Sequence, residues 1–351
     1  MPLRLALTGD HRCSLLHYDE IPLKDDQLRI KTHLASGKYG TWAAISEGSS
    51  FADRRFDHER RLFVEGDEVL CPPPSPEHPL SFGTAVYGTV METGSAVHDA
   101  KPGDVVVAVS ADIRETNVVK KENVFSAAGL DPIHALCAEP AYVAFHAIRE
   151  SRVRYGDSVA VIGLGALGLI AVKMARESGA QFVAAVDPSA GRRALGLRFG
   201  ADVALDPRDG DTALFLRDAT DGKGVDVAIE LSGSYAALES AIRCVRMTGT
   251  ICSAGFYRGE AKDLWLGREW HHNRLEMIVP HGCGWGSPPR DYPRWTERRA
   301  YETIFAQMRA GRLGLDGLID PIVPLRDSTD LFRLCRDEAD RVIKFAVRFD
   351  T

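Results

Sequence analysis

The chain reads Val159-Ala-Val-Ile-Gly163-Leu-Gly165-Ala-Leu-Gly168 at the point that decides its fold. An apolar strand runs directly into a glycine-rich turn and then into a helix, which is the context that gives this spacing a meaning. Gly163 permits the tight turn, Gly165 lets a pyrophosphate approach the backbone, and Gly168 lets the helix pack closely on the strand. The stretch therefore predicts a dinucleotide-binding turn at the helix N-terminus, where free amides favour an anion. A glycine-rich turn without a ligand is the alternative.

An acidic residue, Asp187, ends the next apolar strand after this turn. A carboxylate at this place accepts a hydrogen bond from the ribose 2′-hydroxyl and repels a 2′-phosphate, so NAD is expected rather than NADP. Arg192 and Arg193 oppose this reading, because an arginine nearby can accommodate a 2′-phosphate. Their other interpretation is a solvated helix face.

Outward from the turn, strands and helices alternate from residue 157 onward, which predicts a parallel sheet with crossover helices. The expected strands are 159–162, 182–186, 203–205, 225–230, 250–254 and 275–279, and the expected helices are 139–150, 166–178, 190–199, 212–218, 236–245 and 296–310. Short β-prone runs precede them at 28–33, 68–71, 86–92 and 104–109, and 342–349 alternates like a last strand. We expect an α/β protein with a doubly wound cofactor domain, 151–295, inside a discontinuous β-rich domain, 1–150 with 296–351.

Composition restricts the class of protein. The 351 residues are 45% hydrophobic and 26% charged, with a net charge of −6. This is the range of globular proteins, and without a long basic run it indicates neither a nucleic-acid partner nor an anionic membrane surface. No apolar stretch is long enough for a membrane helix. The seven cysteines are scattered without a CxxC pair, so a reducing cytoplasm is expected.

Several motifs together resemble the medium-chain dehydrogenase/reductase superfamily, on its branch of alcohol and polyol dehydrogenases. The motifs, which span nearly the whole chain, are Ser36–Thr41, Gly83–Gly88, Lys101–Asp104, Glu139-Pro140, Asp226–Gly233, Gly249, Gly255, Leu318–Leu325 and Arg341–Lys344. The resemblance implies a GroES-like catalytic domain, a Rossmann cofactor domain and a homodimer or homotetramer paired through edge strands near 275–279. It also implies cofactor contacts from Gly163, Gly165, Ala166, Leu167, Gly168, Asp187, Arg192, Ser232, Gly233, Gly255, Phe256 and Arg341.

The chain departs from this family at the catalytic zinc. Tyr39 stands where the family has a cysteine, Thr84 and Ala85 stand where it has histidine and glutamate, and Trp42 replaces the acid that ends the first motif. Only Glu139 remains of the expected ligands, and one carboxylate cannot hold a zinc ion that needs three protein ligands. The four-cysteine structural zinc lobe is missing as well. We therefore expect a member that works without zinc.

Without a metal, hydrogen-bonding side chains must stabilise the oxyanion. By the resemblance, Tyr39, Lys38 and Thr41 lie on the turn that faces the reaction centre, and Thr41 matches a proton-relaying hydroxyl. Tyr39 can exchange a proton if Lys38 stabilises its ionised form, or it simply fills the space left by zinc. Glu139 is a general base, a hydrogen-bonding partner of a substrate hydroxyl, or a helix-start carboxylate that the helix dipole favours. His281 borders the nicotinamide by the resemblance, and a structural histidine is the alternative.

The leading hypothesis is a zinc-independent, NAD-linked dehydrogenase of a polar secondary alcohol such as a sugar, cyclitol or polyol. Trp42, Thr84 and Trp285 are the expected substrate contacts, Trp285 from an aromatic, proline-rich loop. Two alternatives stay open. One is an NADPH-dependent, zinc-free reductase of an activated carbon–carbon double bond, and the other is a nucleotide-binding protein that has lost catalysis.

Overall fold

The computed structural model describes residues 1–9, 11–46, 54–66, 73–280, 290 and 292–350. The chain divides into two compact units, one of Met1–Ala128 with Ile319–Thr351 and one of Gly129–Leu318. The boundaries therefore fall at other places than expected. The segments 129–150 and 296–318 belong to the second unit, because helix α3 (Ala138–Glu150) packs against α4 (Ala166–Glu177) and α9 (Glu297–Arg309) packs against α3. No helix in the described part of the chain is both long and apolar enough to cross a membrane.

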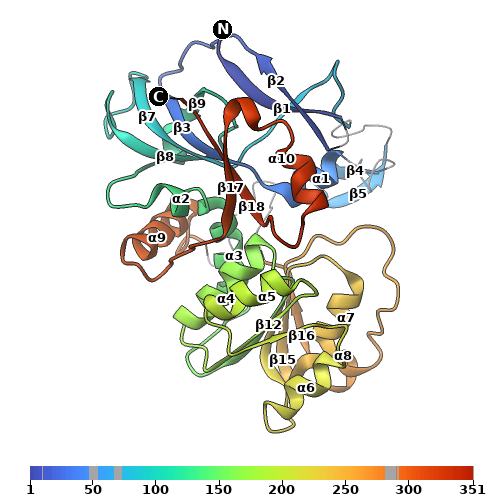
Figure 1. Ribbon diagram of the computed structural model, residues 1–351. Helices are drawn as coiled ribbons and strands as arrows, with labels where there is room; N and C mark the ends of the chain where they lie inside the picture. The colour runs from blue at the N-terminus through green and yellow to red at the C-terminus, as the bar shows by residue number, and fades with distance from the viewer. Residues whose placement is uncertain (10, 47–53, 67–72, 281–289, 291, 351) are drawn as a thin grey trace. The chain divides into compact units, whose positions relative to one another are not determined.

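The first unit is built mainly from antiparallel strands (Figure 1). Its elements are β1 (Leu3–Gly9), β2 (Arg12–His17), β3 (Gln27–Ser36), α1 (Tyr39–Ser46), β4 (Arg54–Asp57), β5 (Leu62–Glu65), β6 (Leu80–Ser81), β7 (Ala85–Thr93), β8 (Val105–Val109), β9 (Thr116–Lys120), η1 (Lys121–Asn123), β10 (Val124–Ser126), β17 (Ile319–Pro324), η2 (Leu325–Asp327), α10 (Leu331–Asp337) and β18 (Lys344–Arg348). The largest sheet runs β10-β8-β7-β3-β18-β17, and β9 also pairs with β3. The C-terminal strand β18 thus lies inside the sheet, between β3 and β17.

Buried and more exposed side chains alternate along the strands of this sheet, so one of its faces packs on the core. In β3, Leu28, Ile30 and Thr32 are buried while the residues between them are not, as expected for a strand with one face on the core. Leu28 and Ile30 join an apolar cluster that includes Phe82, Phe332 of α10 and residues of β1, β7, β8 and β18.

The second unit is a doubly wound parallel sheet, which confirms the expected α/β class. Besides α3, α4 and α9 it contains α2 (Pro132–Ala135), β11 (Ser158–Ile162), β12 (Phe182–Val186), α5 (Ala190–Arg198), β13 (Val203–Leu205), α6 (Thr212–Asp218), β14 (Val225–Glu230), α7 (Tyr235–Cys244), β15 (Val245–Ser253), α8 (Glu269–His272) and β16 (Glu276–Ile278). The strands lie in the order β13-β12-β11-β14-β15-β16, and every neighbouring pair is parallel.

The order of these strands positions the candidate site. From β11 the chain steps outward to β12 and β13, and then returns to β14 on the other side of β11. Because crossovers are right-handed, the helices of the two halves cover opposite faces: α4 contacts α5, whereas α6 contacts α7 (Figure 1). Open sheets of this kind bind ligands beyond the strand ends where the order reverses, here after β11 and β14.

The structure differs from the expected elements in a few places. The strand expected at 250–254 begins earlier, since Val245 already pairs with Val225. The arginines at 54, 55, 60 and 61 lie on or beside the two-stranded hairpin β4–β5. The strand expected at 68–71 lies wholly within 67–72, outside the described residues.

Candidate functional site

The glycine turn after β11 is too tightly packed for larger residues at two of its three glycines. Gly163 has a φ of +88°, and a Cβ there would lie 2.7 Å from the backbone nitrogen of Ser232. A Cβ on Gly168 would lie 1.9 Å from the carbonyl oxygen of Gly163. These glycines therefore keep β11, α4 and the loop after β14 in direct backbone contact.

Gly165 differs from both, because a Cβ there would meet no protein atom within 4 Å. It is the N-cap of α4 with φ −67° and ψ −172°, and its carbonyl accepts the N–H of Leu169 at 3.0 Å. In an α-helix the first N–H groups have no acceptor within the helix, and in α4 these groups belong to Ala166, Leu167 and Gly168. Open space beside these amides and a helix dipole is what a pyrophosphate requires.

Asp187 links this turn to the following strand. Its side chain is buried, its Oδ2 accepts the N–H of Leu164 at 2.7 Å, and its Oδ1 accepts the N–H of Ser189 at 2.8 Å. Arg192 approaches the same carboxylate at 3.9 Å. Arg193 instead donates to the carbonyls of Asp187 and Pro188, both at 2.8 Å, and pairs with Asp206 at 2.9 Å. Asp187 is thus the carboxylate beside the turn, and Arg193 holds the backbone next to it.

A second cluster lies at the end of β14, and its central residue was not expected from the sequence. The carboxylate of Glu230 is fully buried and accepts the N–H groups of Ser232 at 2.7 Å and Gly233 at 3.2 Å. The hydroxyls of Ser232 and Tyr257 donate to it as well. Burial, followed by the negative charge of Glu230, raises the pKa of Tyr257. A charged residue closing an apolar strand was the available signal for Glu230.

The remaining cofactor residues lie around this cluster. A Cβ on Gly255 would be 2.3 Å from the nitrogen of Gly233, so the loops after β14 and β15 touch backbone to backbone. Phe256, the next residue, is exposed by 61%. The loops at the carboxyl ends of the strands, beside Gly163, thus contain Ser232, Gly233, Gly255 and Phe256. Their contact with a cofactor stays a prediction. Arg341 of the first unit pairs with Glu338 at 2.7 Å and Asp320 at 3.6 Å, and its contact with the pyrophosphate also stays a prediction.

In the first unit, the turn between β3 and α1 is held by hydrogen bonds to β18 and to Thr84, the residue before β7. Ser36 Oγ donates to the carbonyl of Phe345 at 2.6 Å, and the buried Lys344 donates from Nζ to the carbonyl of Gly37 at 2.8 Å. Thr84 donates both its N–H and its hydroxyl to the carbonyl of Ser36, at 2.9 and 3.0 Å. Thr84, expected against substrate, thus has a structural bond, and sequence reasoning gave Lys344 no individual role.

Tyr39 begins α1 and hydrogen-bonds a histidine that the sequence analysis did not single out. Tyr39 Oη lies 3.0 Å from Nε2 of His11, which is exposed by only 6%. Both rings pack on Phe332 of α10, with centroid distances of 5.0 Å for Tyr39 and 5.7 Å for His11. Tyr39 therefore fills apolar space and has a protic partner at the same time. Trp42 lies one turn further along α1 and packs against Phe82 at 6.2 Å.

The other catalytic candidates are distributed as follows. Lys38 precedes α1 and is half-buried, and the backbone of Thr41 is in α1, while its side chain is outside the described residues. Glu139, in the first turn of α3, lies in the second unit. Burial, followed by the charge of Glu139, raises the pKa of Tyr301. His281 and Trp285 lie outside the described residues.

The donor chemistry at the expected metal position does not fit zinc. Three of the expected ligands are replaced, by a phenol bonded to His11, a hydroxyl bonded to the Ser36 carbonyl and the methyl group of Ala85. Neutral hydroxyl groups are poor zinc ligands beside thiolate, imidazole and carboxylate. Across the part of the chain that the structure describes, no three His, Cys, Asp or Glu side chains converge to hold a metal ion. The glycine turn, by contrast, fits a dinucleotide.

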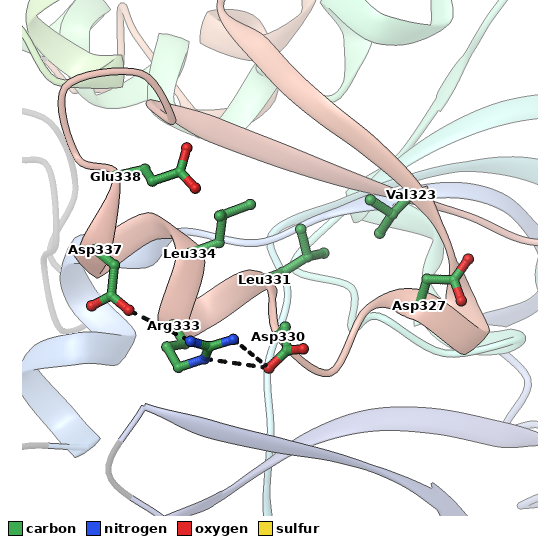
Figure 2. Close-up of a pocket in the computed structure, with 8 residues that line it drawn as sticks. All are labelled: Val323, Asp327, Asp330, Leu331, Arg333, Leu334, Asp337 and Glu338. Carbon is green, nitrogen blue, oxygen red and sulfur yellow. Dashed lines mark hydrogen bonds and ion pairs between the residues drawn. The ribbon is translucent and has the colours of Figure 1, made fainter.

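A cavity of about 220 Å³ beside α10 belongs to none of these groups (Figure 2). Asp327, Asp330, Asp337 and Glu338 supply its acidic lining. Arg333 lies between Asp330 and Asp337 and forms ion pairs with them at 3.2 and 3.8 Å (Figure 2). Asp327 pairs with Arg326 and Glu338 with Arg341, so each charged group of the lining is in an ion pair and we assign the cavity no substrate.

Comparisons with known proteins find similarity to dehydrogenases. Residues 166–297 match the family described as zinc-binding dehydrogenase. The chain is 32% identical over 352 residues to the D-guloside 3-dehydrogenase of Escherichia coli, covering 99% of each chain. Among solved structures it resembles the 2R,3R-butanediol dehydrogenase of Bacillus subtilis, with a TM-score of 0.78 at 20% identity and 99% coverage of both chains. The galactitol-1-phosphate dehydrogenase of Escherichia coli gives a TM-score of 0.76 at 18% identity, again with 99% coverage of both.

Proposed function

Because the chain belongs to the medium-chain dehydrogenase/reductase superfamily, on its alcohol dehydrogenase-like branch, we propose that it oxidises a secondary hydroxyl of a sugar or glycoside with NAD⁺ and without zinc. The coarser activity, oxidoreduction of the CH–OH group of a polar alcohol, follows from the relatives. The similarity to a D-guloside 3-dehydrogenase over 99% of both chains carries the proposal of a glycoside substrate.

The glycine turn and Asp187 support the choice of NAD⁺. Gly165 leaves open space beside the first amides of α4, where the pyrophosphate would bind. The carboxylate of Asp187 is fixed by Leu164 and Ser189, so it is already oriented for the ribose hydroxyl and set against a 2′-phosphate. Bound NAD⁺ supplies the hydride acceptor, and the protein must remove the hydroxyl proton.

The side chains at the expected zinc position support a protic mechanism. Since Tyr39, Thr84 and Ala85 do not fit zinc, no step is assigned to a metal. Tyr39 is the group we propose to accept the proton of the substrate hydroxyl in oxidation and to return it in reduction. Glu139 and His281 are the second choices, and Thr41 and Lys38 would assist Tyr39.

The test is a substrate screen with the purified protein. Glycosides and polyols that differ in the configuration of single hydroxyl groups are incubated with NAD⁺ or NADP⁺, and formation of the reduced cofactor is followed by absorbance. We expect oxidation with NAD⁺, less than stoichiometric zinc by elemental analysis, and full activity after chelator treatment. Stoichiometric zinc with activity lost to chelator would overturn the zinc-free mechanism. Reduction of enones by NADPH without alcohol oxidation would overturn the substrate class.

We also propose that the chain forms a homodimer or homotetramer through β16. This strand is the edge of the parallel sheet, and Val279, which follows it, is exposed by 66%. An apolar sheet edge is a liability unless another chain covers it. Light scattering at micromolar concentration tests the proposal, and a monomer would refute it.

A further inference from the structure

Tyr39 is hydrogen-bonded to a buried imidazole from a part of the chain that no motif identified. His11 lies at the turn between β1 and β2, next to the paired residues Gly9 and Arg12, and its Nε2 is 3.0 Å from Tyr39 Oη. Its φ of +50° is uncommon for a residue with a side chain. The ring is therefore directed at Tyr39 by an unusual backbone conformation and by packing on Phe332.

The same imidazole lines a cavity of about 570 Å³ in the first unit. Thr8, Arg12 and Ser75 contribute polar groups to this cavity, and Arg333 and Arg336 of α10 line it as well. The carboxylate of Asp337 lies close enough to His11 for their charges to interact. Polar walls can hold water that takes up a proton.

We propose that His11 is the relay through which Tyr39 exchanges its proton with solvent. The inference rests on the proposed function of Tyr39 as the acid–base group. In oxidation, the substrate C–H bond breaks and its electron pair leaves as hydride to the nicotinamide. The hydroxyl proton passes to Tyr39 Oη, the phenolic proton passes to His11 Nε2, and the opposite ring nitrogen of His11 releases a proton to water in the cavity. The balance is alcohol and NAD⁺ in, and ketone, NADH and one proton out.

An imidazole suits this task because one ring nitrogen can accept a proton while the other gives one up. In this role His11 does not contact the substrate. It acts through Tyr39 and is therefore a positioning residue.

The test uses two substitutions that tolerate the backbone at this turn. Glycine and asparagine both adopt positive φ more readily than most residues, so His11→Gly and His11→Asn should fold. Neither can carry a proton from Tyr39 to the cavity. We expect kcat for the alcohol to fall by about 10²-fold in both, with little change in KM or NADH affinity. His17→Gly, at an exposed histidine of the same hairpin, is the matched control and should keep full activity.

Chemical rescue separates a relay from a merely structural role. Free imidazole can enter the space vacated in His11→Gly from the adjoining cavity, and it should restore kcat in proportion to its concentration without affecting the wild type. In a second readout, nitrogen NMR of histidine-labelled protein should show the His11 resonance shifting in Tyr39→Phe while that of His17 stays in place.

The outcomes distinguish the relay from the proposed function. Wild-type turnover on a glycoside with unaltered kcat in both His11 variants would overturn the relay and leave the function standing. A loss of kcat that imidazole does not restore would reduce His11 to packing and overturn the relay too. Absence of wild-type alcohol oxidation would overturn both.

Discussion

Asp187 and Leu164 are joined by a hydrogen bond of 2.7 Å from the backbone N–H of Leu164 to the carboxylate of Asp187. The bond connects the end of β12, the proposed ribose position, with the glycine turn, the proposed pyrophosphate position. Since Ser189 binds the other carboxylate oxygen at 2.8 Å, the side chain is fixed before any cofactor arrives. A preoriented acceptor contributes to binding without a further cost of ordering it.

The first prediction concerns cofactor choice at this carboxylate. NADH should bind the wild type at least ten-fold more tightly than NADPH, and Asp187→Ala should weaken NADH binding about ten-fold or more, since a hydrogen bond to a charged group contributes roughly 1.5–3 kcal/mol. Fluorescence titration of both reduced cofactors measures this. Asp209→Asn, at an exposed acid in the loop after β13, is the control. Tighter binding of NADPH by the wild type would show that Arg192 determines the preference.

The second prediction compares two glycines of one turn. Gly165→Ala should leave the melting temperature unchanged, because its φ of −67° suits alanine and no protein atom lies within 4 Å of the new Cβ. It should nevertheless weaken NADH binding at least ten-fold, because the methyl group occupies the space of the phosphate. Gly168→Ala should lower the melting temperature, because its Cβ would lie 1.9 Å from the Gly163 carbonyl and overpacking costs about 1–3 kcal/mol. Unchanged NADH affinity in Gly165→Ala would place the phosphate elsewhere.

The third prediction tests Tyr39 itself. Tyr39→Phe keeps the ring that packs on Phe332 at 5.0 Å and removes only the hydroxyl that faces His11. The melting temperature and NADH affinity should hardly change, while kcat should fall by about 10²–10⁴-fold, the usual effect of losing an acid–base group. Steady-state kinetics measures kcat and KM of this variant. Tyr155→Phe is the control, since Tyr155 is exposed by 92%. Normal turnover of Tyr39→Phe would make Tyr39 a space-filling residue.

The fourth prediction is a pH dependence of stability at Asp206. Hydrogen bonds from the side chain of Arg208 and then from its backbone N–H hold the pKa of Asp206 below its ordinary value, and the charge of Arg193 adds to this. A depressed pKa means that the carboxylate stabilises the fold above its unfolded pKa, near 3.9, and that this contribution is lost as pH falls below that value. Asp206→Asn should therefore be less stable than the wild type at pH 7 but should lose less stability between about pH 4 and pH 2. Urea unfolding across this range gives the comparison, and parallel curves for the two proteins would contradict it.

The sequence predicted the second unit well because its signals are local. Strands 182–186, 203–205 and 225–230 and helix 212–218 agree with the structure, since each is a short apolar or amphipathic run between turn residues. The parallel pairing followed from alternation alone.

The first unit was less predictable, because its site is assembled from distant segments. Nothing near His11 indicates that it will meet Tyr39, whose place is set by β3 and by the packing of α10. Lys344 reaches Gly37 only because β18 pairs with β3. The domain boundaries were displaced for a related reason, since which unit α3 and α9 join depends on packing between helices, and hydrophobic periodicity does not specify the partner of a helix.

The position of β18 inside the first sheet has a consequence for how the protein is made. Ser36 of β3 bonds to Phe345 of β18 across 309 residues of chain. During synthesis the whole of Gly129–Leu318 therefore emerges before the first unit can acquire its inner strand. The parallel sheet can fold on the ribosome during this time. Until β18 is made, β3 has an unpaired hydrogen-bonding edge, and unpaired strand edges promote aggregation. We expect the newly made N-terminal segment to depend on chaperones, and chains stopped before β18 to precipitate rather than yield an independently folded first unit.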